Sequence, residues 1–329
     1  MAQVSGTTDT FDSAVLKESL DSVIWDLFPM DTYFISNADK VNVGNTQHQW
    51  VFDSLAAAAA NKQLEGDDVT YTTLATAVRV SNYTQISSKT ILLSDTYTDG
   101  VKTVGQNPMG RAIMKAMKEL KRDMEFTCLG KQGSSAGATA TARATGGVEA
   151  WIWGQGATIA GNTVLPTLNT TGTTPSYASS AVAGVTDGTT GITVTLADIT
   201  SALELAWIDG GEPEILLCSS VQKGDIDAMT SLATRQVDVG RTEALPISNT
   251  ANVIVTSFGT CKVILSRYVH RTTTLALDMS QWAVGQLRPI KVKDMAKTGD
   301  AEKKLLVGEY CVIARNPNSS AKLTAFAAT

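Results

Sequence analysis

The strongest local signal in this 329-residue chain lies at residues 107–130, which read NPMGRAIMKAMKELKRDMEFTCLG. The Asn107 side chain can accept hydrogen bonds from the first N–H groups of a helix, and Pro108 suits the first helical position, where no N–H partner is needed. Gly130 is a typical residue at which a helix ends. The pattern therefore predicts a helix over residues 107–130.

The apolar residues of this segment indicate how the helix packs. They recur every three or four positions and so share one face: Met109, Ile113, Met117 (or Ala116), Leu120 and Met124. The other positions are mostly charged, and the pairs Lys115–Glu119 and Lys121–Glu125 lie one turn apart. Such pairs contribute about 0.2–0.5 kcal/mol each. We expect a long helix that rests on the body by one side.

Before this helix, residues 46–94 contain two segments in which apolar and polar residues alternate, as in half-buried strands. They are Gln47–Phe52 and residues 77–80, and the region between them includes Asn61 and Gly66. The sequence predicts a β-hairpin with an irregular tip that extends away from the body. A two-stranded hairpin is at best marginally stable alone in water, so this one requires a partner surface.

The chain ahead of the hairpin, residues 1–45, carries scattered apolar residues with some helical spacing, then Pro29 and a polar stretch at residues 36–40. We interpret it as an N-terminal arm with a short helix.

Residues 133–191 differ in composition from the rest of the chain. Of these 59 residues, 40 are Gly, Ala, Ser or Thr, and the only charged ones are Arg143, Glu149 and Asp187. The apolar group at residues 151–153 argues against a disordered linker, because exposed tryptophans need a partner surface. We expect a partly ordered insertion located at the surface.

The last third of the chain alternates short apolar strands with turns. A second helix is predicted at residues 196–207, with Leu196, Ile199, Leu203 and Trp207 on one face. Strands are expected at residues 214–218, 253–255, 262–265, 274–277, 286–292 and 305–314. Helices and strands mix without regular βαβ units, so the fold class is α+β.

Composition limits the classes of function. The chain has 27 Lys and Arg against 32 Asp and Glu, a net charge of −5, so contact with nucleic acid would have to be local. Its longest apolar run, residues 55–60, is far below the ~18 residues of a membrane span. The N-terminus lacks the pattern of a secretory signal. We expect a soluble protein made in the cytoplasm, with no membrane partner.

Residues that carry chemistry are few. Cys128, Cys218, Cys261 and Cys311 are far apart in the sequence, which argues against a zinc or redox motif and indicates buried thiols. His48 and His270 are the only histidines and lie in no catalytic motif. No phosphate-binding loop occurs. We predict no catalytic residue, no cofactor and no metal.

Two charged clusters have structural interpretations. The segment Glu65, Gly66, Asp67, Asp68 does not match a calcium loop, and a solvated hairpin tip or a salt-bridge donor to a neighbouring subunit is the favoured reading. The basic run at residues 118–122 alternates with acids, so a solvated or subunit-facing surface is expected.

The order of these elements resembles the major capsid protein of tailed double-stranded-DNA bacteriophages, with the Hong Kong 97-type fold. Several strings are similar to one phage major head protein family: TFDS at 10–13, PMDT at 29–32, HQW at 48–50, DSLAAA at 53–58, EGD at 65–67, NYTQI at 82–86, KELKRDME at 118–125, LRP at 287–289 and AKTGD at 296–300.

The resemblance implies a division of the chain. Residues 1–45 would be the N-terminal arm, residues 46–94 the extended hairpin loop that lies across a neighbouring subunit, and residues 107–130 the spine helix. The peripheral domain would comprise residues 95–131 and 266–329. The axial domain would comprise residues 132–265, including the insertion at about 133–191.

The function that the resemblance implies is structural. Copies of the chain would assemble as pentamers and hexamers into an icosahedral head, a virion capsid built in the host cytoplasm. Its partners would be itself, scaffolding and portal proteins, and packaged DNA at the inner surface, contacted without sequence specificity. Charged or aromatic side chains in these segments are the candidate inter-subunit residues: Trp50, Glu65, Asp67, Asp68, Arg79, Lys121, Arg122, Asp123 and Arg288.

Three alternatives remain open at this level. A nanocompartment shell of the same fold would enclose a cargo enzyme instead of a genome. A β-rich fibre or adhesin would explain the Ser/Thr/Gly/Ala insertion but not the charged helix. A hydrolase would depend on His48 or His270 and lacks the motifs of that class.

Overall fold

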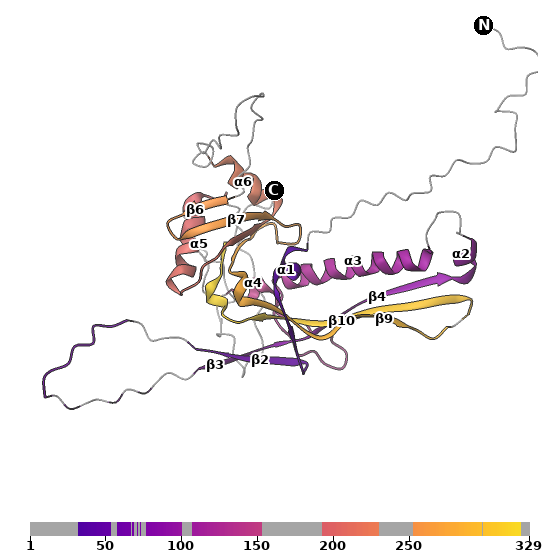
Figure 1. The fold of residues 1–329 in the computed structure, drawn as a ribbon, viewed down its shortest axis with the longest axis horizontal. Helices are drawn as coiled ribbons and strands as arrows, with labels where there is room; N and C mark the ends of the chain where they lie inside the picture. Colours follow the sequence, from indigo (N-terminus) through magenta and orange to yellow (C-terminus); the bar gives the residue numbers. More distant parts are fainter. Residues whose placement is uncertain are drawn as a thin grey trace, which may run out of the picture.

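The computed structural model describes residues 32–53, 58–66, 68, 71, 73, 77–100, 107–152, 193–229, 253–297 and 299–323. In these residues a long helix lies along a four-stranded sheet, a five-stranded sheet forms a second body, and a hairpin projects from the first sheet (Figure 1). The α+β class predicted from the sequence is confirmed. Within the described ranges no helix has the length and apolar character needed to cross a membrane.

The predicted long helix is present as α3, Pro108–Cys128. The Asn107 side-chain oxygen accepts hydrogen bonds from the N–H groups of Met109 at 3.0 Å and Gly110 at 3.5 Å, as expected of a cap. At the position that the sequence left open, Ala116 is buried and Met117 is exposed. The helix therefore packs by the predicted face with the smaller residue at its centre.

The four-stranded sheet supports α3. Its order is β1 (Asp39–Asn42), β9 (Trp282–Asp294), β10 (Ala301–Ala314) and β4 (Gln85–Ser94). β10 is antiparallel to both neighbours, whereas β1 runs parallel to β9. α3 lies beside β4 and β10, with the short α2 (Asp95–Gly100) at the far end of β4 (Figure 1).

The five-stranded sheet has the order β11 (Ala321–Leu323), β8 (Thr274–Leu277), β5 (Ile215–Cys218), β7 (Gly259–Leu265) and β6 (Val253–Thr256). Helices α5 (Leu196–Ile208) and α6 (Ser220–Ala228) pack against it. The strands β5, β6 and β7 of this sheet come from residues 215–265, whereas β8 and β11 come from residues 274–323. The sheet is therefore completed by strands that follow later in the chain. All strands predicted in this region, and those predicted at 286–292 and 305–314, are present.

The second predicted helix is confirmed, but its buried face differs from the prediction. Thr195 and Asp198 form a capping box at the start of α5. Ile199 and Leu203 are buried, whereas Trp207 is 56% exposed. Assigning Trp207 to the core face was wrong because the small residues Ala202 and Ala206 occupy that face.

The described part of the Gly/Ala/Ser/Thr-rich insertion is divided: residues 135–136 and 138–142 are exposed, in agreement with the predicted surface location, whereas residues 145–152 are buried, where that prediction is wrong. The short helix α4 (Val148–Trp151) is buried along its whole length, and Trp151 and Ile152 have no exposed surface. These side chains belong to the same core as Leu120 and Met124 of α3. Residues 153–191 of the insertion lie outside the described residues, as do residues 1–31 of the predicted arm.

The predicted hairpin consists of β2 (Gln47–Phe52) and β3 (Val78–Tyr83), paired antiparallel from Gln47 opposite Tyr83 to Phe52 opposite Val78. It projects from the body away from the α2 end of the sheet (Figure 1). The arm region contributes α1 (Tyr33–Asn37), which packs on α3, and then β1. Two 3-10 turns, Met279–Gln281 and Pro317–Ser319, complete the elements.

Candidate inter-subunit surfaces

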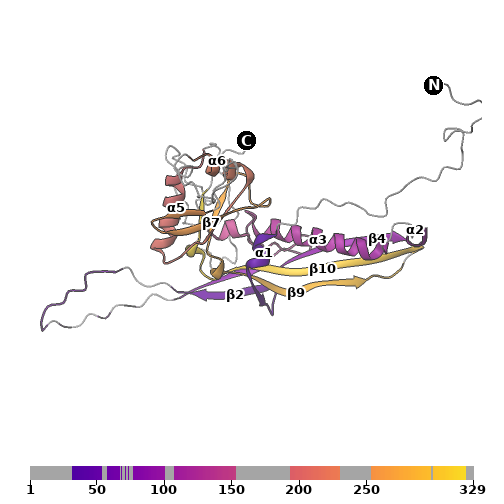
Figure 2. The same ribbon diagram turned by 45° about the horizontal axis from the view of Figure 1, so that its top comes forward.

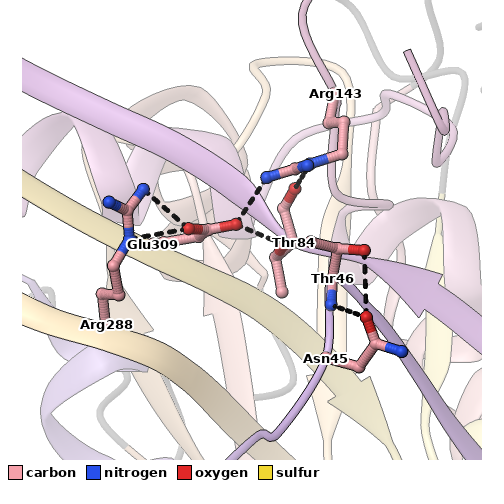
Figure 3. Close-up of polar contacts among 6 residues, drawn as sticks. All are labelled: Asn45, Thr46, Thr84, Arg143, Arg288 and Glu309. Atoms are coloured by element: carbon pink, nitrogen blue, oxygen red, sulfur yellow. Dashed lines mark hydrogen bonds and ion pairs between the residues drawn. The ribbon is translucent and has the colours of Figure 1, made fainter. Parts of the chain in front are cut away.

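Glu309 of β10 is the centre of a buried ionic network (Figure 3). Its carboxylate accepts hydrogen bonds from Arg288 Nε at 2.9 Å and from Thr84 Oγ1 at 2.7 Å. Arg143 Nη2 donates to Glu309 Oε1 at 2.6 Å, the same oxygen that accepts from Thr84, whereas Arg288 binds the other oxygen, Oε2. The network exists because Glu309 and Arg288 are opposite each other in the β10–β9 register, where side chains are close.

The electrostatics of this network favour the ionised carboxylate. Burial alone would raise the pKa of Glu309, but the hydrogen bonds from Thr84 and Arg288 and the charges of the two arginines hold the pKa below its usual value. Two guanidinium groups face one carboxylate, and the Arg288 side chain is 46% exposed. The network therefore presents part of its positive charge to solvent beside the root of the hairpin.

Trp50 fixes the root of the hairpin to the body. Its indole Nε1 donates a hydrogen bond to the carbonyl oxygen of Ala314 at 2.7 Å. Its ring packs against buried Trp151, with ring centroids 5.1 Å apart, and stacks on His48 at 5.7 Å. This contact places Trp50 in the interface between hairpin and body of its own chain.

Asn82 forms a second anchor on the other strand of the hairpin. Its side-chain nitrogen donates to the carbonyl of Val312 at 2.7 Å and to Thr145 Oγ1 at 3.0 Å, while its oxygen accepts from the N–H of Gly146 at 2.9 Å. The side chain is fully buried. Close to it, the N–H of Thr84 donates to the carbonyl of Thr46, and the N–H of Thr46 donates to Asn45 (Figure 3). The base of the hairpin is thus held rigidly.

The described residues at the tip of the hairpin are exposed. Leu64 is 79% exposed and Tyr71 is 93% exposed, although both are large and apolar in part. Glu65 and Gly66 form a turn, and Gly66 adopts a positive φ of 82°, which favours glycine. The hairpin therefore combines an anchored root with an exposed tip that carries both apolar and acidic side chains.

The candidate residues predicted from the sequence occupy several sites. Glu65 and Asp68 are exposed at the tip, Arg79 is exposed on β3, and Asp67 lies outside the described residues. On α3, Lys121 is exposed, Arg122 is partly exposed, and Asp123 pairs with Lys89 at 2.7 Å. Trp50, Asp123 and Arg288 each contact their own chain. The structure of one copy places Trp50 and Arg288 at the hairpin root, Arg79 on the hairpin strand β3, Glu65 and Asp68 at the tip, and the α3 residues on a separate element.

Of the two histidines, His270 lies in a polar cluster, with its Nδ1 3.0 Å from Lys131 Nζ, which pairs with Glu149 at 3.8 Å, whereas the cysteines lie in the core. All four cysteines are buried and reduced, and burial raises the pKa of Cys261 to about 11 and of Cys218 and Cys311 to about 12. Partial burial lowers the pKa of His48, which stacks on Trp50. In the part of the chain that the structure describes, no group of three or more His, Cys, Asp or Glu residues is placed to hold a metal ion.

Comparison with known proteins decides the family. Residues 3–327 match the family model of the SU10 major capsid protein. The chain belongs to the SU10 major capsid protein family. Because the match covers almost the whole chain, it includes the hairpin, α3 and both sheets described above.

Individual relatives agree with this assignment. The major capsid protein of Escherichia phage Phieco32 is 25% identical over 348 residues, covering 95% of each protein. Among solved structures, a cyanophage A-1(L) capsid asymmetric unit has a TM-score of 0.67 at 14% identity, covering 97% of this chain and 98% of that one. A phage G structure of gp27 major capsid proteins with gp26 decoration proteins has a TM-score of 0.55 at 12% identity, covering 99% and 100%. These structures confirm the capsid fold.

As a member of the SU10 major capsid protein family, this chain builds the head of a bacteriophage and is located in the virion capsid. It is a structural protein and not an enzyme. The fibre, nanocompartment and hydrolase hypotheses are therefore replaced by the capsid assignment.

Sequence reasoning missed the residues that lock the hairpin root: Asn82, Thr84, Arg143 and Glu309. Their partners are far apart in the chain, which local patterns do not reveal. One signal was present, because Arg143 and Glu149 are rare charges in a segment of small residues. Both are in buried polar networks in the structure, since Thr273 Oγ1 donates to Glu149 at 2.9 Å.

Proposed function

We propose that this major capsid protein assembles as pentamers and hexamers into an icosahedral shell around double-stranded DNA, and that the β2–β3 hairpin of each copy lies across a neighbouring copy. The observation that carries the proposal is the hairpin tip, where Leu64 and Tyr71 are 79% and 93% exposed. Large apolar side chains at the end of a projecting hairpin gain stability when a second copy covers them.

The acidic residues of the tip need a complementary surface, and the four-stranded sheet has one. Lys89 of β4 faces α3, as its ion pair with Asp123 demonstrates, so the alternate residue Leu92 faces away from the helix. Lys303 lies opposite Leu92 and shares its side of the sheet. The side away from α3 therefore carries Lys303.

Two further lysines lie on this side. In the β10–β9 register, Leu305 is opposite Lys293 and Val307 is opposite Lys291. Leu305 and Val307 flank Leu306, which faces α3, so both residues and the lysines opposite them point away from the helix. We call Lys291, Lys293 and Lys303 the basic sheet face. In Figure 2 the hairpin strand β2 lies beside β9 rather than beside α3, which supports the proposal that the tip meets this side of a neighbouring copy.

The proposed division of the chain follows from these roles. Residues 46–94 serve as the extended loop, with β4 joining that loop to the sheet. Residues 95–131 and 266–329 form the peripheral domain around α3 as the spine helix, and residues 132–265 form the axial domain. The strands β8 and β11 tie the two domains together, because they belong to the 266–329 segment but complete the five-stranded sheet.

The proposed partners are other copies of the chain, scaffolding and portal proteins, and packaged DNA. Each contact between copies is individually modest, and many identical contacts act at once in a closed symmetric shell.

The test is assembly of a double variant, Leu64→Ser with Tyr71→Ser. We expect it to fold, as measured by circular dichroism, and to form no shells or rings in negative-stain electron microscopy and light scattering. The matched control is Ile208→Ser, which removes a 63% exposed apolar side chain far from the tip and should assemble as the unmodified chain does. Normal shells from the double variant would contradict the hairpin's role.

A further inference from the structure

The charges of α3 are sorted by the fold. In the sequence its bases alternate with acids, and a solvated or subunit-facing surface is expected. In the structure Asp123 turns toward β4 and pairs with Lys89, and Glu125 is fully buried beneath α1. Of the acids on α3, Glu119 and Asp123 remain partly exposed, and the charge of Asp123 is paired with Lys89. The outward side of the helix is therefore much more basic than its sequence indicates.

The bases on that outward side form a line. They recur at intervals of three or four residues, as positions on one helix face do, and we call them the α3 stripe: Arg111, Lys115, Lys118, Lys121 and Arg122. Lys115, Lys118 and Lys121 are exposed, and the two arginines are partly exposed. At 1.5 Å per residue the stripe is roughly 16 Å long. That length equals roughly five steps of duplex DNA at 3.4 Å per step.

We propose that the α3 stripe faces the interior of the head and binds the phosphate backbone of the packaged DNA. The inference rests on the proposed function, in which the shell encloses DNA and the hairpin of a neighbour covers the basic sheet face. With that opposite side taken by the hairpin tip, the α3 side from Arg111 to Arg122 is left to face the interior, while α1 covers the next turn of the helix at Glu125. Since the chain as a whole has a net charge of −5, this stripe is a local exception to its overall charge.

The composition of the stripe fits DNA better than an acidic protein. Exposed lysines are flexible point charges, so they can bind phosphates at any position along a DNA backbone. Such contacts carry no sequence information. A protein partner binds through a few buried anchors surrounded by a rim, whereas the stripe is an even row of charges. Every copy in the shell presents the same row to the same polymer.

The first test measures binding to a short DNA duplex as a function of salt. In the variant Lys115→Gln, Lys118→Gln, Lys121→Gln, the slope of log K against log salt should become less steep by about 2.7, since each lost phosphate contact removes about 0.9. The control is Lys40→Gln, Lys262→Gln, Lys297→Gln, three exposed lysines outside α3. Both variants change the net charge from −5 to −8. The control should keep the slope, and equal slopes in both variants would overturn the proposal.

A second test uses unmodified heads and so does not depend on a variant that folds. Lysines of DNA-filled and emptied heads are acetylated and compared by mass spectrometry. Lys115, Lys118 and Lys121 should react several-fold less in filled heads, whereas Lys40 should react equally in both. If the three α3 lysines react equally in filled and emptied heads, the proposal is overturned. It is also overturned if the stripe variant keeps the salt dependence of its DNA binding but loses binding to polyglutamate, since that result identifies an acidic protein as the partner.

These outcomes separate the two proposals. If the unmodified chain forms no shells, the proposed function fails. If shells form and the stripe variant binds DNA as the unmodified chain does, the inference about α3 fails alone.

Discussion

The carboxylate of Glu309 joins three parts of the chain that are distant in sequence. Arg143 comes from the small-residue segment, Arg288 from β9 and Thr84 from the junction between β3 and β4. Removing one partner of a buried ion pair is costly because the remaining charge keeps its desolvation penalty. At the scale of single residues, Glu309 is therefore one of the side chains that hold the hairpin root, together with Trp50 and Asn82.

We predict that Glu309→Gln lowers the free energy of unfolding by about 3 kcal/mol, measured by urea denaturation. The control is Glu302→Gln. Glu302 forms an ion pair with Lys304 near the surface, and its loss should lower the free energy of unfolding by less than about 1 kcal/mol. Because the pKa of Glu309 in the folded state is below its ordinary value of 4.5, its contribution is present above pH 4.5 and is lost as pH falls through the folded pKa. A difference between wild type and variant that stays constant into strong acid would contradict this account.

At the scale of elements, a side chain of α3 caps α1. The Glu125 carboxylate accepts hydrogen bonds from the N–H groups of Phe34 at 2.7 Å and Ile35 at 2.9 Å. These N–H groups belong to the first turn of α1, where no side chain from Thr32 acts as a cap. A buried acid on one helix therefore holds the first turn of another, and it fixes where the N-terminal region meets the body.

We predict that Glu125→Ala lowers the free energy of unfolding by about 1–3 kcal/mol and speeds hydrogen exchange at Phe34 and Ile35, because two buried donors lose their acceptor. Glu119→Ala on the same helix, a partly exposed position, should change stability by less than about 0.5 kcal/mol. Unchanged exchange at both N–H groups would show that α1 needs no cap.

The contribution of Glu125 to the free energy of unfolding changes with pH in the opposite direction to that of Glu309. Burial raises the pKa of Glu125 above its ordinary value of 4.5, and the two backbone hydrogen bonds only partly offset the rise. The folded state then binds the proton more tightly than the unfolded chain does, so the contribution of Glu125 declines as pH rises through the folded pKa. The stability gap between wild type and Glu125→Ala should be wider in mild acid than at neutral pH.

Local sequence signals were sufficient for α3 and for most strands. Asn107, Pro108 and the spacing of Met109, Leu120 and Met124 specify the helix without reference to the rest of the chain. The burial of Glu125 was missed because its partners lie 90 residues away or more. Trp151 was misplaced because its mostly small neighbours resemble a loop, whereas they allow the chain to pack closely in the core.

At the scale of the whole molecule, the order of elements predicted the capsid fold, but it did not predict which surfaces face one another. The basic sheet face is formed by lysines of two strands brought into register, and the α3 stripe emerges only when Asp123 pairs with Lys89 and Glu125 is buried. Both depend on long-range pairing. The sequence therefore identified the charged segments, while their partition between two opposite sides required the structure.

We predict that charge reversal distinguishes the proposed contact between copies. Glu65→Lys with Asp68→Lys, or Lys291→Glu with Lys293→Glu, should each reduce the yield of shells in electron microscopy several-fold, because like charges would meet at the hairpin tip. A chain with all four substitutions restores opposite charges and should recover shells. If the four-substitution chain assembles no better than either pair alone, the tip does not dock on the basic sheet face.

The connection between the hairpin and the sheet has a mechanical consequence. β3 ends at Tyr83, and only Thr84 separates it from β4, which pairs with β10 over ten consecutive positions from Gln85 to Ser94. A pull on the tip therefore travels along the strand axis and loads those ladder hydrogen bonds in shear, so that they resist together instead of opening one at a time. In a shell stretched from within, each hairpin would act as a tension strap whose anchor is an entire strand.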